Sequence, residues 1–86
     1  MLTSKKGEAA ARDIQVWANG IAKQLDETVN VEVLYDADSS GYLLRLIKGA
    51  RVLLFRLSDA QVHGAGREAE CERTLRRKIK DLWNLI

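Results

Sequence analysis

Residues 42–57 read YLLRLIKGARVLLFRL, and this stretch decides the fold. Residues 48–51 predict a two-residue hairpin turn, because a type II′ turn favours glycine at its first central position, here Gly49. The turn joins predicted strands over residues 42–47 and 52–57. One face of this hairpin carries Tyr42, Leu44, Leu46, Leu53, Phe55 and Leu57. The other carries Leu43, Ile47, Val52 and Leu54, with Arg45 and Arg56 among them.

A hairpin that is apolar on both faces needs a cover on both sides. A half-exposed antiparallel sheet normally alternates apolar residues inward with polar residues outward. The richer face, with its aromatic residues, is expected to meet the protein's helices. The second face is then covered either by the chain's own final helix, in a helix–sheet–helix sandwich, or by another molecule.

Helical spacing on both sides of the hairpin predicts the remaining elements. Residues 8–26 show an apolar stripe of helical period, formed by Ile14, Trp17, Ile21 and Leu25. Gly20 inside it costs about 1 kcal/mol relative to alanine, so it marks either a weak spot or a close approach of two backbones. Val31, Val33 and Tyr35 alternate as a strand does. From residue 67 onward a second helical stripe contains Cys71, Leu75, Ile79, Leu82 and Ile86.

These elements predict an α+β fold of order α-β-β-β-α. Short connections favour a three-stranded antiparallel meander with two helices packed mainly on one face. Ser58 and Gln61 have the spacing of a capping box, which predicts a helical turn after the third strand. All five aromatic residues are expected on core faces: Trp17, Tyr35, Tyr42, Phe55 and Trp83.

Composition is typical of one small globular domain spanning residues 1–86, with residues 1–6 expected to fray. The chain is 47% hydrophobic and 30% charged, with a mean hydropathy of −0.22. It shows neither a membrane-length apolar stretch nor the apolar core of a secretory signal. A single cysteine fits a reducing compartment, so we expect a cytoplasmic protein. One cysteine and one histidine do not build a structural zinc site, and we expect neither metal nor cofactor.

The second hairpin face is the first candidate site. The first strand adds Leu34 to it, and the predicted interface consists of Leu34, Leu43, Arg45, Ile47, Val52, Leu54 and Arg56. Five aliphatic side chains on one face approach the few hundred Å² at which an exposed patch usually indicates interaction. The leading hypothesis is a non-enzymatic interaction module that forms a homodimer or binds another protein. The two arginines would then pair with Glu32, or other carboxylates, across a two-fold axis.

A basic segment supports a second hypothesis, nucleic-acid binding. Residues 1–40 contain four basic and seven acidic groups, whereas residues 41–86 contain ten and five. Arg73, Arg77 and Lys80 follow one another at helical spacing and are the candidate phosphate contacts. The structural alternative is a solvated helix face, since cations in the second half of a helix suit its dipole.

Two further patterns carry weaker hypotheses. His63 and Cys71 are the only candidates for a hydrolase-type dyad, although Cys71 lies on an apolar stripe where cysteine behaves as a buried hydrophobe. Residues 36–41 place oxygen side chains and a glycine as the first half of an EF-hand loop does, but Ile47 stands where its bidentate glutamate belongs. We expect a hairpin loop there, in which Asp36 bonds nearby backbone and Gly41 supplies a positive φ.

Overall fold

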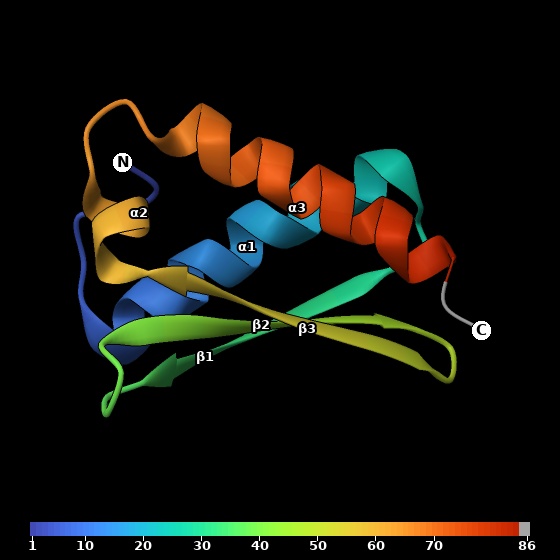
Figure 1. Ribbon diagram of the computed structural model, residues 1–86, viewed down its shortest axis with the longest axis horizontal. Coiled ribbons are helices and arrows are strands. Elements are labelled where there is room, and N and C mark those ends of the chain that lie inside the picture. The colour runs from blue at the N-terminus through green and yellow to red at the C-terminus, as the bar shows by residue number, and fades with distance from the viewer. Residues whose placement is uncertain (85–86) are drawn as a thin grey trace.

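A computed structural model describes residues 1–84, in which an antiparallel sheet carries two long helices on one side (Figure 1). The elements are α1 (Gly7–Leu25), β1 (Asn30–Asp36), β2 (Gly41–Lys48), β3 (Arg51–Ser58), α2 (Asp59–His63) and α3 (Glu68–Trp83). The strand order is β1-β2-β3. This architecture confirms the predicted α-β-β-β-α meander. Across residues 1–84, the helices are all too short or too polar to span a membrane.

The hairpin that decided the fold has the predicted register. Lys48 pairs with Arg51 across the turn, and Gly49 has a φ of +59°, the left-handed value that a type II′ turn requires at that position. Leu44 lies opposite Phe55 on β3. On the other side of β2, Leu34 of β1 lies opposite Leu43. The two faces are therefore those that the sequence indicates.

The core lies between the inner sheet face and the helices. Helix α1 packs on β1, and α3 packs mainly on β3 (Figure 1). Without α3, the inner side chains of Phe55 and Leu57 on β3 would have no helix above them. This explains why the predicted sandwich alternative is wrong: α3 is needed on the same side as α1. The α3 stripe of Cys71, Leu75, Ile79 and Leu82 is buried there, and Ile86, its predicted last member, lies outside the described residues.

Trp83 departs from the expectation that every aromatic residue packs in the core. It lies at the last residue of α3 and remains 38% exposed. Its indole Nε1 donates a hydrogen bond to the Asp26 carboxylate at 3.0 Å. The hydrogen bond of Trp83 therefore links the C-terminal ends of α1 and α3. Gly20 is exposed, and an added Cβ would meet no atom within 4 Å, so a close backbone approach does not explain it.

The loop after β1 is the hairpin loop that the sequence predicts, with one correction. Asp36 accepts hydrogen bonds from the Asp38 backbone N–H and the Ser39 hydroxyl. The positive φ belongs to Ser40, at +49°, and not to Gly41. Gly41 is needed for space instead, because a Cβ there would lie 3.1 Å from the carbonyl oxygen of Leu57.

Two other local expectations concern the chain around α2. The predicted capping box is confirmed: the Ser58 hydroxyl accepts from the Gln61 N–H, and the Gln61 side chain accepts from the Ser58 N–H. Fraying of residues 1–6 stays a prediction. In the structure, the Leu2 N–H donates to the Val62 carbonyl, and Thr3 is buried.

Candidate interaction surface

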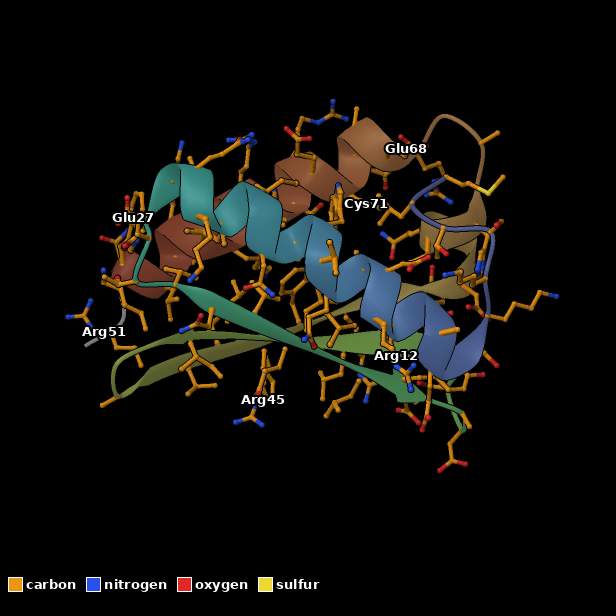
Figure 2. The ribbon with its side chains drawn as sticks, turned by 180° about the vertical axis from the view of Figure 1, so that it is seen from behind. Arg12, Glu27, Arg45, Arg51, Glu68 and Cys71 are labelled. Carbon is orange, nitrogen blue, oxygen red and sulfur yellow. The ribbon has the colours of Figure 1, made fainter. Side chains whose placement is uncertain are left out.

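The outer face of the sheet is the side turned away from both helices. Its aliphatic members are those that the sequence predicts: Leu34, Leu43, Ile47, Val52 and Leu54. Leu34, Val52 and Leu54 are 54%, 44% and 55% exposed, and Leu43 and Ile47 are half-buried. Figure 2 shows Arg45 pointing away from the helix layer on this face. Nothing within residues 1–84 covers the outer face.

The outer-face arginines find carboxylates within their own chain. Arg45 Nη1 lies 3.1 Å from Glu32 Oε1 on the neighbouring strand. Arg56 Nη1 lies 2.9 Å from Asp36 Oδ2, and this bond holds the pKa of Asp36 below its ordinary value. Both arginines therefore have a carboxylate partner within their own chain, and their pairing across a two-fold axis stays a prediction. The charges of the outer face are neutralised locally, which leaves its aliphatic side chains as the dominant feature.

Side chains from α1 bond the first part of the free edge of β1, from Val31 to the Val33 N–H. Asn19 donates to the Val31 carbonyl at 2.8 Å and accepts from the Val31 N–H at 2.9 Å. Gln15 accepts from the Val33 N–H at 3.0 Å, and Lys23 donates to the Val29 carbonyl at 2.7 Å. These contacts satisfy backbone groups that an edge strand would otherwise expose. The spacing of residues 8–26 alone predicts no contact between these three helix residues and the sheet.

A signal for this closure is present in the sequence. Gln15, Asn19 and Lys23 recur every fourth residue and form a row along one side of the helix. Their polar side chains are long enough to form hydrogen bonds with the backbone of a neighbouring strand. The same row on an isolated helix would simply face water. Only the position of β1 beside α1 gives it a structural role.

The edge of β3 has no such closure. In a two-residue hairpin the residues that flank the turn form a hydrogen-bonded pair, here Lys48 and Arg51. Alternate residues of β3 from Arg51 onward thus bond β2, while Val52, Leu54 and Arg56 direct their N–H and C=O groups outward. None of these three has a hydrogen-bond partner for its backbone N–H among residues 1–84. The two edges of the sheet are therefore chemically different.

The two arginines near the free edge of β3, Arg51 and Arg56, form hydrogen bonds within their own chain. Arg51 Nη1 donates to the Trp83 carbonyl at 2.8 Å. Arg56 is engaged by Asp36 and also donates to the Ser39 hydroxyl at 2.9 Å. Natural edge strands use charged side chains to repel incoming strands. On β3 these guanidinium groups are occupied elsewhere, and the segment between them is apolar.

The proposed dyad residues have separate backbone partners. His63 Nε2 lies 2.6 Å from the Lys5 carbonyl, and its Nδ1 lies 3.1 Å from the Asp59 carbonyl. The Cys71 thiol donates to the Gln61 carbonyl at 3.4 Å. Cys71 is only 1% exposed, and burial raises the pKa of its thiol. Over residues 1–84, no three His, Cys, Asp or Glu side chains are grouped so as to hold a metal ion.

The basic residues of α3 lie on its solvent side. Arg73, Arg77 and Lys80 are exposed and form no ion pair with the residues described up to Asn84. Their neighbour Arg76 is different, since its Nε lies 2.9 Å from Glu72 Oε2. The three cations are on the helix layer, opposite the outer sheet face.

Comparison with protein-family models, with curated proteins and with solved structures gives no match for this chain.

Proposed function

We propose that this protein is a non-enzymatic interaction module that self-associates through its outer sheet face. The uncovered aliphatic set on that face carries the proposal. Contiguous exposed apolar patches of this kind are typical of protein–protein contact sites. A second copy is the occupant that hides the patch on both partners at once, because a two-fold contact joins the same surface to itself.

Electrostatics on the outer face favour a copy of the same chain. Two identical surfaces carry identical charges, so an unpaired arginine at the contact would be left without a counter-charge unless a carboxylate lay at the position opposite it. Arg45 with Glu32, and Arg56 with Asp36, form ion pairs inside each chain. Covering a charge that already has its partner costs less than covering an isolated one. The face therefore needs no complementary charge from its partner.

The solution mass tests this proposal. In sedimentation velocity over a range of concentrations, the wild type is expected to move from monomer toward dimer. The double variant Ile47→Asp and Leu54→Asp is expected to stay monomeric, because it places two carboxylates in the patch. Val16→Asp is the matched control: Val16 is an exposed aliphatic residue on α1, away from the outer face.

The outcomes separate clearly when circular dichroism confirms that all three proteins fold. A wild type that stays monomeric at high micromolar concentration overturns self-association. A wild type that dimerises while the double variant dimerises equally well overturns the outer face as the contact.

One observation favours a second candidate function, nucleic-acid binding by α3. Arg73, Arg77 and Lys80 have no ion-pair partners up to Asn84, so their charges are available to phosphates. Electrophoretic shifts at low salt with single- and double-stranded RNA and DNA test it. Binding is expected to weaken in Arg73→Glu with Arg77→Glu, and not in Arg12→Glu on α1. The absence of a shift with every nucleic acid removes this candidate.

A further inference from the structure

We infer that two copies of this chain meet along β3, which pairs antiparallel with the β3 of the second copy about a two-fold axis. The six strands then form one continuous sheet. This inference rests on the proposed self-association and places its contact at the β3 edge. There Val52 and Leu54 of the outer face meet the second copy, while Leu34, Leu43 and Ile47 stay on the open face of the six-stranded sheet.

The unpaired backbone of β3 indicates what its partner must be. Val52, Leu54 and Arg56 direct N–H and C=O groups away from the sheet, in the alternation of a strand that lacks its neighbour. Another β-strand is the ligand that satisfies such a row of donors and acceptors. Because Asn19 and Gln15 already bond Val31 and Val33 on the β1 edge, the incoming strand is directed to β3.

The side chains of β3 are complementary to a second β3. A two-fold axis at Leu54 places Leu54 opposite its own copy and pairs all three outward residues, with Val52 opposite Arg56 of the second copy. On the inner face, Leu53 comes opposite the second copy's Phe55. Side chains directly opposite across antiparallel strands have Cβ atoms about 4.5–5.5 Å apart, so these apolar pairs are close enough to pack against each other.

Charge disfavours one neighbouring register. A shift that moves the axis to Arg56 sets two guanidinium groups directly opposite each other, and like charges in that position are unfavourable. With the axis at Leu54, each Arg56 faces a valine and keeps its ion pair with Asp36. Arg51 likewise keeps its bond to the Trp83 carbonyl. No contact within either chain has to break.

Intermolecular distances test the pairing. Leu54→Cys and Leu34→Cys each introduce one accessible thiol for a nitroxide label, because Cys71 is buried. The two positions are matched: both are leucines of the outer face with 55% and 54% exposure. In the paired dimer, the two Leu54 Cα atoms lie about 5.5 Å apart. The two Leu34 positions are separated by five strand spacings, on the order of 24 Å.

Dipolar EPR on both labelled proteins distinguishes this inference from the broader proposal. A short distance at residue 54 with a long one at residue 34 supports pairing along β3. Similar short distances at both positions indicate stacked faces, which overturns the inference and leaves the proposed function standing. An unlabelled wild type that stays monomeric overturns both.

Amide exchange on the unlabelled wild type provides a second measurement. The Leu54 N–H is expected to exchange more slowly as the protein concentration rises, because it gains a partner only in the dimer. The Leu53 N–H is the internal reference, since it faces β2 in either state. If the mass doubles while exchange at Leu54 stays constant, pairing along β3 is wrong.

Discussion

Two glycines of this chain occupy positions with opposite demands. Gly49 has a φ of +59° at the hairpin turn, a backbone conformation that L side chains rarely adopt. Gly20 lies in the interior of α1 on an exposed surface, where nothing approaches it. The first is required by geometry. The second has no conformational or steric reason in the structure.

Replacement of Gly20 by alanine is therefore expected to stabilise the protein. The gain is about 1 kcal/mol in the free energy of unfolding, the difference between glycine and alanine inside a helix. Urea denaturation of Gly20→Ala against the wild type measures it. Gly49→Ala is the control and is expected to lower the free energy of unfolding. A Gly20→Ala protein no more stable than the wild type would contradict the helix-propensity argument.

The buried hydroxyl of Tyr42 is a second informative residue. It has no hydrogen-bond partner among residues 1–84, and burial raises its pKa to about 12. The alternation of side chains along β2 correctly predicts that Tyr42 lies on the inner face of the sheet, because successive side chains of a strand point to opposite faces. This alternation does not predict whether the Tyr42 hydroxyl finds a hydrogen-bond partner, because that depends on how segments distant in sequence pack around it.

The secondary-structure elements are the part of this structure that the sequence predicts best. The hairpin turn, the two helical stripes and the capping box at Ser58 all depend on near neighbours in sequence, and all are confirmed. The side of the sheet on which α3 packs depends on long-range geometry, and the sequence left it open. The sequence does not predict that Gln15, Asn19 and Lys23 of α1 bond the strand beside them. A polar helix residue next to a strand and one in water look alike in sequence.

The contact between α1 and the β1 edge predicts a cost for removing Asn19. Asn19→Ala leaves both the N–H and the C=O of Val31 without their partner. Partly buried backbone groups that lose a hydrogen bond cost roughly 1–3 kcal/mol, and we expect a loss of that size in urea denaturation. Gln24→Ala, an exposed amide on the same helix, is the control and is expected to have little effect. Equal stabilities of the two variants would contradict the role of Asn19.

Asp26 joins three parts of the whole molecule. It lies at the C-terminal end of α1, accepts from Trp83 at the end of α3, and forms an ion pair with Lys48 beside the hairpin turn. The Lys48 ammonium, together with Thr28, holds the pKa of Asp26 well below its ordinary value. The folded state therefore binds a proton at this carboxylate less readily than the unfolded state does.

This difference predicts acid sensitivity. A lowered folded-state pKa contributes stability above the unfolded value, about 3.9 for aspartate, and the contribution is lost as the pH falls below that value. The free energy of unfolding is expected to decrease less steeply on acidification in Asp26→Asn than in the wild type. Asp38→Asn, whose carboxylate accepts no hydrogen bond within residues 1–84, should keep the wild-type slope. Urea titrations at neutral and acid pH measure both, and equal slopes would contradict the role of Asp26.

In the inferred pair of copies, the side chains that α1 lays along β1 also limit how many copies can join. A sheet that grows strand by strand needs an open edge at each end, and with two open edges addition continues into a fibre. At the β1 end, Asn19 and Gln15 already bond Val31 and Val33, and Lys23 bonds the preceding Val29. In the inferred β3 pair, strand addition is therefore expected to end at two copies. Three polar residues on one helix would then limit the size of the assembly.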